Sequence, residues 1–348
     1  MSATAARRGF ASDNAATVHP RVLEALSAVN AGHAFGYGHD AYTQSVERRL
    51  ARALGVPDAQ VLFVFNGSGA NVLSLRAALR PWEAAIVSEN AHLATDEVGA
   101  PEAIAGVKLL AAKTRDGRVT LEGVRRLIER PNDEHAVRPG LLSLTQSTEL
   151  GTLYGLQELR ELATLAHSHG LRVHVDGARF ANAAAALGVS LAELLDACGA
   201  DLLSFGGTKN GLMGAEAVVV RDPLLADGLL HLRKQTLALA SKMRFLAAQF
   251  DALLDDDLWL HNAAHANAMA RRLHAAVSGI EGVQVTRPTE VNAVFAVIPR
   301  AARERLQRDF DFYEWDDTTG EVRWMCSWDT TEQDIDEFAA AVRTAVAG

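Results

Sequence analysis

Three segments of this sequence place small or polar residues directly after a short apolar run. NGSGAN at 66–71 follows VLFVF, Asp176 ends the apolar stretch of VHVDGARF at 173–180, and Lys209 follows two glycines in SFGGTKNG at 204–211. Backbone N–H groups at a helix start attract an anion, a carboxylate can pair with a protonated ring nitrogen, and an amine can form an imine with an aldehyde. The order of the three segments therefore predicts a site for an aldehyde cofactor that carries a phosphate and a pyridine nitrogen.

Each segment also has a plain structural interpretation, and these alternatives stay open on the residues alone. NGSGAN could be an ordinary strand-to-helix turn, Asp176 could pair with Arg179, and Lys209 could be a solvated loop lysine. Lysine is scarce, however, because arginine supplies nearly all of the positive charge; the other lysines are Lys108, Lys113, Lys234 and Lys242. A guanidinium cannot form a useful imine, so a lysine at a strand end favours the chemical interpretation.

The elements that must position these residues alternate between strand-like and helix-like segments over residues 40–220. Asp40 is expected to cap a helix with apolar positions Val46, Leu50 and Leu54, and Gly55 to end it. Short apolar runs predict strands, with VLFVF expected as a buried parallel strand, at 61–65, 85–88, 107–112, 141–145, 171–175, 202–205 and 215–220. This alternation predicts an α/β fold, a mostly parallel sheet with helices on both faces, whose site lies beyond the carboxyl ends of the strands.

A different pattern follows the last of these strands. Helices near 223–275 lead to four strand-like segments, VQVTR, NAVFAVI, FDFYEW and EVRWMCSW, with further helices expected at 300–308 and 331–346. We therefore predict two domains, a large cofactor-binding domain with an N-terminal arm at 1–249 and a smaller α+β domain at 250–348.

Charge and cysteine content narrow the class of protein. The 348 residues carry a net charge of −9, so the chain lacks the basic footprint expected for binding nucleic acid or an anionic membrane. Cys198 and Cys326 are the only cysteines, which argues against a disulfide framework and fits a reducing cytoplasm. We expect neither a signal peptide, because no apolar core follows the basic residues near the N-terminus, nor a membrane-spanning segment.

Taken in order, the segments resemble the threonine aldolases, part of the β-eliminating lyase group within the aspartate-aminotransferase (fold type I) superfamily of pyridoxal-phosphate (PLP) enzymes. HVDGARF and SFGGTKNG carry most of the resemblance, which runs over nearly the whole chain. The other matching segments are FASDNAATVHPRVLEAL at 10–26, GYGHDAYTQSVERRLA at 36–51, NGSGAN, AHLATDE at 91–97, LLSLTQSTELGTLY at 141–154 and EVRWMCSWDTTEQDIDEF. The chain departs from the family's pattern at His39 in YGHD, at CSWD, and at TQSTEL, which replaces a commoner Glu-Asn-Thr-His-like segment.

The resemblance implies a role in cofactor binding for several residues. Lys209 would be the Schiff-base lysine, Asp176 would pair with the pyridine nitrogen, and His92 would stack on the ring. The phosphate would be held through backbone amides and a hydroxyl by Gly67, Ser68 and Gly69. Arg179 and Arg244 are also expected near the cofactor, and no metal ion is expected in the site.

The same resemblance implies residues that bind substrate. The substrate carboxylate would be gripped by Ser12, Arg179 and Arg323. His135, just before the LLSLT strand, matches a family histidine near the substrate hydroxyl, which makes it the candidate base, with His92 as the next one. Tyr37 and Arg244 would reach the site of a neighbouring subunit, which implies a homodimer or homotetramer with shared active sites.

The function implied is aldol cleavage of L-threonine, L-allo-threonine or a related β-hydroxy-α-amino acid to glycine and an aldehyde, with PLP as cofactor. SFGGTKNG resembles a branch that includes phenylserine-cleaving enzymes, so a preference for L-phenylserine is one alternative. Another β-eliminating lyase, an aminotransferase, and a PLP-binding protein without catalysis are the others. An adenine-dinucleotide enzyme is disfavoured, because NGSGAN does not match the G-x-G-x-x-G spacing.

Overall fold

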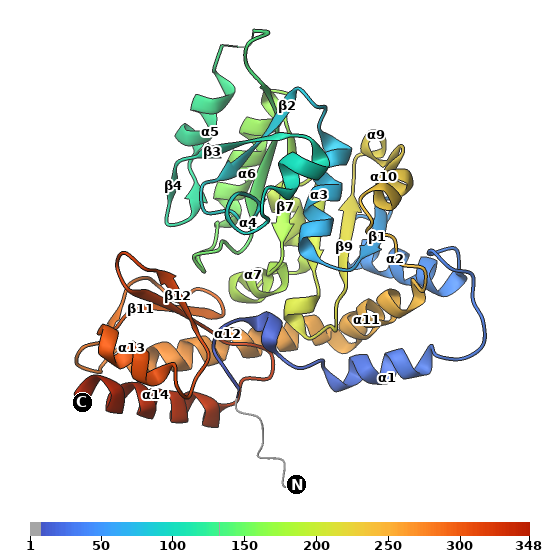
Figure 1. Ribbon diagram of the computed structural model, residues 1–348. Helices are drawn as coiled ribbons and strands as arrows, with labels where there is room; N and C mark the ends of the chain where they lie inside the picture. The colour runs from blue at the N-terminus through green and yellow to red at the C-terminus, as the bar shows by residue number, and fades with distance from the viewer. Residues whose placement is uncertain (1–7, 132) are drawn as a thin grey trace.

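The computed structural model describes residues 8–131 and 133–348 and is built around a seven-stranded sheet (Figure 1). The strands lie in the order β1-β9-β8-β7-β6-β2-β3. Their bounds are β1 Gln60–Val64, β2 Glu83–Ser88, β3 Lys108–Ala112, β6 Arg138–Thr145, β7 Arg172–Gly177, β8 Leu202–Gly206 and β9 Glu216–Val220. Pairing is parallel from β8 through β7, β6 and β2 to β3, as the alternating sequence pattern predicted.

One strand expectation was wrong. The VLFVF segment forms β1, which lies at the edge of the described sheet and pairs with β9 in the antiparallel direction. β9 is also antiparallel to β8. A continuous apolar run shows that both faces of a strand are buried, which holds for β1, but it does not show the direction of its neighbour.

The sheet separates two hydrophobic cores, because alternate side chains of each strand point to opposite faces. In β1, Val61 and Phe63 join one core, whereas Leu62 and Val64 join the other. The helices that contribute to the first core include α1 Pro20–Ala28, α2 Ala41–Ala53, α5 Leu121–Ile128, α6 Leu156–Ser168, α7 Phe180–Leu187, α8 Leu191–Cys198 and α11 Arg244–Leu254. Those of the second are α3 Gly67–Ala78, α4 His92–Thr95, α9 Pro223–Ala226 and α10 Leu229–Gln235. Helices therefore cover both faces, as predicted.

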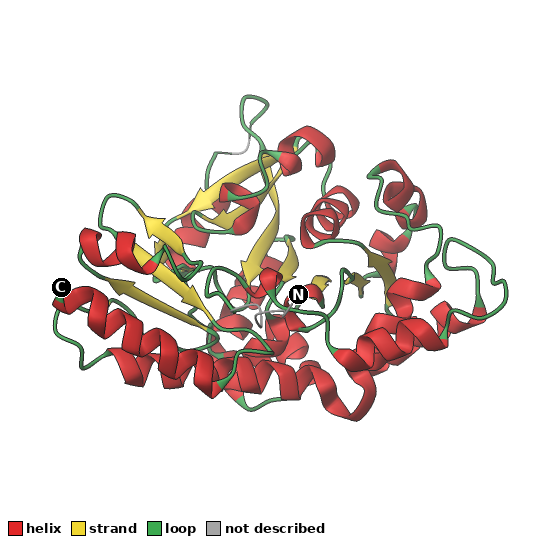
Figure 2. Cartoon of the chain, turned by 60° about the horizontal axis from the view of Figure 1, so that its bottom comes forward, coloured by secondary structure: helices red, strands yellow, loops and turns green. Residues whose placement is uncertain are grey.

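A second, antiparallel sheet lies toward the C-terminus. It has the order β10-β11-β13-β12, with bounds β10 Gln284–Val285, β11 Ala293–Val297, β12 Tyr313–Asp316 and β13 Glu321–Met325. Helices α12 Leu258–Val277 and α14 Glu332–Ala347 pack side by side beneath it, and α13 Arg300–Leu306 contacts α14 (Figures 1 and 2). The predicted domain boundary near residue 250 stays a prediction.

The faces of this small sheet differ in what they bury. Val322 and Trp324 of β13 point into a core shared with α12 and α14. Arg323, between them, points to the opposite face, beside Phe295 of β11 in the register of the two strands. Strand alternation thus turns a guanidinium toward the large sheet.

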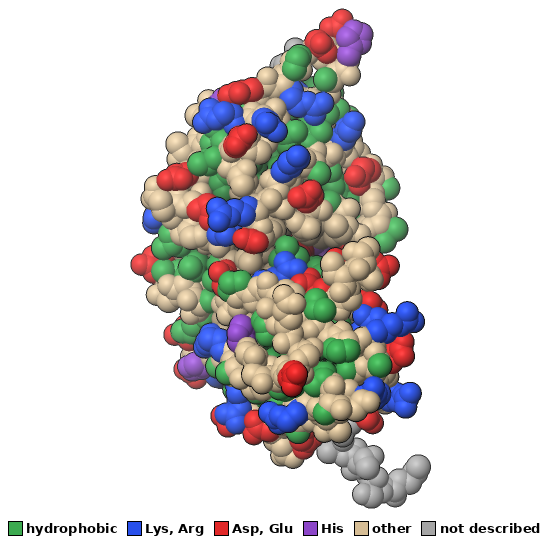
Figure 3. Space-filling model, turned by 90° about the vertical axis from the view of Figure 1, so that its left-hand side faces the viewer, with side chains coloured by type: hydrophobic (Ala, Val, Ile, Leu, Met, Phe, Trp, Pro, Cys, Tyr) green, Lys and Arg blue, Asp and Glu red, His purple; other side chains and the backbone are tan. Residues whose placement is uncertain are grey.

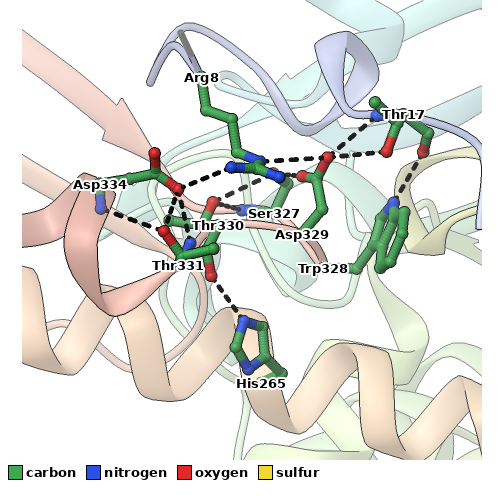
Figure 4. Close-up of polar contacts among 9 residues, drawn as sticks. All are labelled: Arg8, Thr17, His265, Ser327, Trp328, Asp329, Thr330, Thr331 and Asp334. Carbon is green, nitrogen blue, oxygen red and sulfur yellow. Dashed lines mark hydrogen bonds and ion pairs between the residues drawn. The ribbon is translucent and has the colours of Figure 1, made fainter. Parts of the chain in front are cut away.

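The N-terminal arm is fastened to a loop that is distant in sequence (Figure 4). Arg8 forms ion pairs with Asp329 at 3.7 Å and with Asp334 at 3.4 Å. Thr17 donates its hydroxyl to Asp329 at 2.8 Å, and its carbonyl accepts the indole N–H of Trp328 at 2.8 Å. The arm is therefore held at both ends, and the residues between them are fixed over the edge of the large sheet.

The surface and the helix lengths complete the description. On the face shown in Figure 3, basic and acidic side chains are interspersed, in a chain of net charge −9. Across the described ranges, no single helix has the length and apolar character needed to cross a membrane, and one bent pair, α7 with α8, passes by length and composition only.

Candidate active site

A cavity of about 590 Å³ lies between the carboxyl edge of the large sheet and the small sheet. Its lining comes from segments that follow β2, β6, β7 and β8, from the N-terminal arm, and from β12 and β13. These residues are Ser12, Asn14, Asn90, His92, Thr95, Asp96, Glu149, Arg179, Lys209, Tyr313, Glu314, Trp315 and Arg323. A larger cavity of about 700 Å³ includes Arg80, Arg138 and Arg172 in its lining but none of the predicted site residues. The smaller cavity is therefore the candidate active site.

Lys209 reaches this cavity from a tightly folded turn after β8. A Cβ on Gly206 would lie 2.5 Å from the carbonyl oxygen of Ala178, and one on Gly207 would lie 2.7 Å from that of Ala215, so both positions need glycine. The buried carboxylate of Glu216 accepts the amide N–H of Gly207 at 3.0 Å. Burial raises the pKa of Glu216 to about 7, although hydrogen bonds from the turn and the charge of Lys209 oppose it. The turn holds Lys209 half-buried at the cavity wall.

Asp176, at the end of β7, is a buried carboxylate without a cationic partner. Its Oδ1 accepts the Ala178 amide at 3.1 Å, and its Oδ2 accepts the side-chain amide of Asn71 at 3.0 Å. Among residues 8–131 and 133–348, no Lys or Arg forms an ion pair with it. Arg179 instead grips Asp13 through Nε at 2.7 Å and Nη2 at 2.9 Å, so the alternative Asp176–Arg179 pair is wrong. A buried carboxylate without an ion-pair partner can form one with a protonated ring nitrogen.

A chain of hydrogen bonds connects Asp176 to His92. Asn71 donates also to Glu97 Oε1 at 2.9 Å, and the same oxygen lies 2.9 Å from His92 Nδ1. The hydrogen bond to Glu97 raises the pKa of His92 against the effect of burial, and the charges of Glu149, Glu97 and Asp176 add to the rise. These hydrogen bonds fix the imidazole ring of His92 at the cavity wall through its Nδ1 atom.

The NGSGAN segment forms the first turn of α3, next to Asp176. The side chain of Asn66 caps this helix by accepting the Gly69 amide at 2.7 Å, so that amide is already occupied. Gly67 faces open space, since an added Cβ would meet no atom within 4 Å. The amides of Gly67 and Ser68 and the Ser68 hydroxyl are the donors that this helix start can offer to an anion.

Of the two predicted carboxylate-binding arginines, Arg323 is the available one. Its guanidinium lies over the Trp315 ring at 4.5 Å, and only the carbonyl of Ala11, at 3.5 Å, accepts from it within the part of the chain that the structure describes. Its buried Nε has no partner there. Burial lowers the pKa of Arg323, and the charge of Arg179 lowers it further against nearby carboxylates. A buried guanidinium without a carboxylate partner is a site for an anion.

Arg179 lines the cavity but is already paired with a carboxylate of its own chain, so its predicted contact with the substrate carboxylate stays a prediction. The bidentate pair with Asp13 occupies its Nε and Nη2, and it raises the pKa of Arg179 although burial alone would lower it. Asn292 supports the pair by donating to Asp13 at 3.0 Å. Ser12, which lines the cavity, accepts the Asn14 amide at 3.1 Å. Arg179 therefore anchors the arm that carries Ser12.

His135 does not line the cavity of its own chain, so its predicted placement beside the substrate hydroxyl stays a prediction. It lies exposed in the turn before β6, with its amide donating to Asp133 at 3.0 Å. A strand the length of Arg138–Thr145 spans about 23 Å, and the site lies beyond its far end. The residue that follows β6 into the cavity is Glu149.

Tyr37 and Arg244 also lie outside this cavity. Tyr37 is 47% exposed, has a φ of 64°, and donates its amide to the Ser241 carbonyl at 3.0 Å. Arg244, at the start of α11, donates to the carbonyls of Ala31 and Gly32. Their predicted action in the site of a neighbouring subunit stays a prediction.

Several functional candidates were missed from the sequence, and the signals for them differ. Glu149 stands in TQSTEL, directly after a predicted strand. The rule that the site lies beyond the carboxyl ends of the strands, which predicted Asp176 and Lys209, would also have predicted Glu149. Asp13 stands beside Ser12 in the resembling segment at 10–26, but its partner Arg179 is 166 residues away. Asn71 and Glu97 act only through contacts across the fold, for which the sequence offers no local pattern.

Comparisons with known proteins agree with this geometry. A model of the family described as Beta-eliminating lyase matches residues 9–301. A low specificity L-threonine aldolase of Pseudomonas sp. (strain NCIMB 10558) is 41% identical, and one of Pseudomonas aeruginosa is 42% identical, each over 96% of both chains. The solved structure of a threonine aldolase from Leishmania major is 32% identical, covers 97% of this chain and 99% of its own, and superposes with a TM-score of 0.91.

Proposed function

This chain belongs to the beta-eliminating lyase family, and we propose that it cleaves the Cα–Cβ bond of L-threonine, L-allo-threonine or a related β-hydroxy-α-amino acid. The products are glycine and an aldehyde. One observation carries the proposal: the amine of Lys209 lines the same cavity as the guanidinium of Arg323, which has no carboxylate partner among the described residues. The predicted fold type, lyase class and PLP cofactor are confirmed.

The cavity, together with Asp176 and the start of α3, fits PLP by the chemistry of its polar groups. The Lys209 amine would bind the cofactor aldehyde, Asp176 would hold the proton on the ring nitrogen, and His92 would lie along the ring. The Gly67 and Ser68 amides at the start of α3 would bind the phosphate. When bound, PLP accepts into its ring the electrons released at the α-carbon.

The residues of the chain select which bond breaks. Only a bond perpendicular to the cofactor ring overlaps its π system, so the group that fixes the substrate carboxylate also chooses the reacting bond. Arg323 can make two parallel hydrogen bonds to that carboxylate. Such positioning contributes several kcal/mol, on the order of a 10³-fold rate gain, to a reaction of this kind.

The test is an assay of glycine and aldehyde release from L-threonine, L-allo-threonine and L-phenylserine, with the D-isomers as controls. We expect stoichiometric glycine and aldehyde from at least one L-substrate and none from the D-isomers. Release of ammonia and a keto acid instead would identify an elimination, and a keto acid formed with transfer of the amino group to an added keto-acid acceptor would identify a transamination. A protein that binds PLP and converts none of these substrates would be a non-catalytic binder.

Arg323→Lys should raise KM for the amino acid about 10- to 100-fold, because an ammonium cannot reproduce two parallel hydrogen bonds to a carboxylate. The matched control is Arg287→Lys, since Arg287 also stacks on an aromatic ring of the small sheet, Phe295 at 4.7 Å, and pairs with Glu321. That variant should keep the wild-type KM. Equal KM values for Arg323→Lys and the wild type would show that the carboxylate binds elsewhere.

We propose also that the active unit is at least a dimer. Two apolar side chains in this region are exposed and could be covered by a second copy of the chain. Phe35, two residues before Tyr37, is 82% exposed, and Leu237, on the adjoining loop, is 89% exposed. Tyr37 and Arg244 would then act in the neighbouring cavity. A fully active monomer in sedimentation would exclude this arrangement.

The expected cytoplasmic location belongs to the proposal as well. Cys198 and Cys326 are both buried and free, and burial raises the pKa of each thiol. Inert, reduced thiols suit a reducing compartment. Fractionation of cells that produce the protein would test this location.

A further inference from the structure

Glu149 presents a buried carboxylate to the active-site cavity. The residue is 8% exposed and lines the cavity directly after β6. Within residues 8–131 and 133–348, its carboxylate forms neither a hydrogen bond nor an ion pair. Buried carboxylates are normally paired because an unpaired one costs several kcal/mol, so an available one facing a cavity points to a ligand.

The loop that carries Glu149 is held by hydrogen bonds of its neighbouring side chains. The Thr148 and Thr152 hydroxyls lie 2.7 Å apart, and that of Thr152 also donates to the Asp116 carbonyl at 2.6 Å. The side chain of Gln146 bonds both the amide and the carbonyl of Tyr154, each at 3.1 Å. These contacts aim the side chain of Glu149 without using its carboxylate.

The charge of Glu149 acts on groups that surround the substrate position. The raised pKa values of His92 and Arg179 have larger causes, but the negative charge of Glu149 adds to both. The same charge opposes the lowering of the pKa of Arg323. Glu149 thus lies near all three, although it forms no ion pair with any of them in the described chain. Its carboxylate therefore lines the cavity that would hold the amino acid and is available there to accept a proton.

The other groups in the cavity that could accept a proton are already engaged or exposed. His92 is tied through Nδ1 to Glu97, whose hydrogen bond raises the pKa of the imidazole and so favours its protonated form. Glu314 accepts from Arg303 at 2.6 Å. Asp96 is exposed and accepts the Thr95 hydroxyl at 3.1 Å.

We propose that Glu149 is the base that removes the β-hydroxyl proton during carbon–carbon cleavage, an inference that rests on the proposed function. The proton passes from the hydroxyl oxygen to the Glu149 carboxylate as the Cα–Cβ bond breaks and the C=O of the aldehyde forms. The electron pair of the broken bond stays with the α-carbon. A proton from the Lys209 ammonium completes glycine, and Glu149 returns its proton to solvent.

Glu149→Gln keeps the size and polarity of the side chain and removes the base. We expect kcat for aldehyde release to fall about 10²- to 10⁴-fold, the usual contribution of a general base, with KM changed by less than about 5-fold. Exchange of the glycine α-proton for deuterium, followed by NMR, should stay within about 5-fold of the wild type, because that step involves no β-hydroxyl. Glu158→Gln, which removes a carboxylate outside the cavity, should leave both rates unchanged.

A second variant separates chemistry from folding. In Glu149→Ala, added formate should restore aldehyde release in proportion to its concentration, because it can occupy the vacated space and accept the proton. A kcat near wild type in Glu149→Gln would overturn the proposal, and so would an equal fall in glycine exchange or the absence of rescue by formate. A wild-type enzyme that releases no aldehyde overturns the proposed function together with this role, whereas failure of the variants alone leaves the function standing.

Discussion

Lys209→Ala should lower turnover by about 10⁴-fold or more, on the scale seen when a covalent catalytic group is removed. The reason is specific to this cavity: Lys209 is the one lysine in its lining, as far as the described ranges extend, and no arginine can replace its amine. The direct measurement is the rate of glycine formation with the protein saturated with PLP. The purified variant should also lose the visible absorbance that a lysine-linked cofactor gives.

Chemical labelling provides the control for that result. Borohydride reduction of the wild-type protein with PLP should attach the cofactor to the peptide that contains Lys209. Lys113→Ala removes an exposed lysine outside the cavity and should keep wild-type turnover and labelling. A label on Lys108, Lys113, Lys234 or Lys242 would disprove the assignment.

Asp176→Asn should lower kcat about 10²-fold, which corresponds to about 3 kcal/mol for the loss of one well-placed electrostatic partner. The substituted amide can turn its oxygen toward the Asn71 amide, so the contact now made at 3.0 Å can persist while the charge is lost. We therefore expect PLP binding to weaken far less than turnover. The measurements are kcat from aldehyde release and the PLP dissociation constant by titration.

Asp201→Asn is the matched control for Asp176→Asn. Asp201 lies just before β8, at the amino edge of the same sheet, where its carboxylate accepts the Val173 amide at 2.8 Å. This change removes one carboxylate from the sheet without touching the cavity, and kcat should not change. If Asp176→Asn turned over as fast as Asp201→Asn, the ring nitrogen would not depend on Asp176.

The sequence was most informative where a residue's role follows from its place on one strand. Asp176 and Lys209 could be predicted because an apolar run ends directly before each segment, and parallel strands end at one edge of a sheet. The same rule points to Glu149, which follows β6, whereas His135 precedes that strand and was proposed from family resemblance alone. The role of His135 stays a prediction, because the lining of a single chain's cavity does not include it.

Contacts between distant segments could not be predicted in this way. The pair between Arg179 and Asp13 joins the end of β7 to the N-terminal arm, and neither residue type nor spacing marks them as partners. Strand order is similarly hidden, because VLFVF would read the same beside a parallel or an antiparallel neighbour. Burial periodicity is a local property, whereas the choice of neighbour depends on the whole topology.

The fastening of the N-terminal arm has a consequence for how the enzyme is made. Thr17 and its anchor Asp329 are 312 residues apart, and Arg8 is 326 residues from Asp334. During translation, the arm emerges from the ribosome first and its anchors emerge only after the rest of both sheets has been made. The nascent chain can therefore assemble the large sheet early, and the pair between Arg179 and Asp13 can form with it. The contacts of Arg8 and Thr17, and the wall that carries Arg323, can form only when the C-terminal part of the chain has been made.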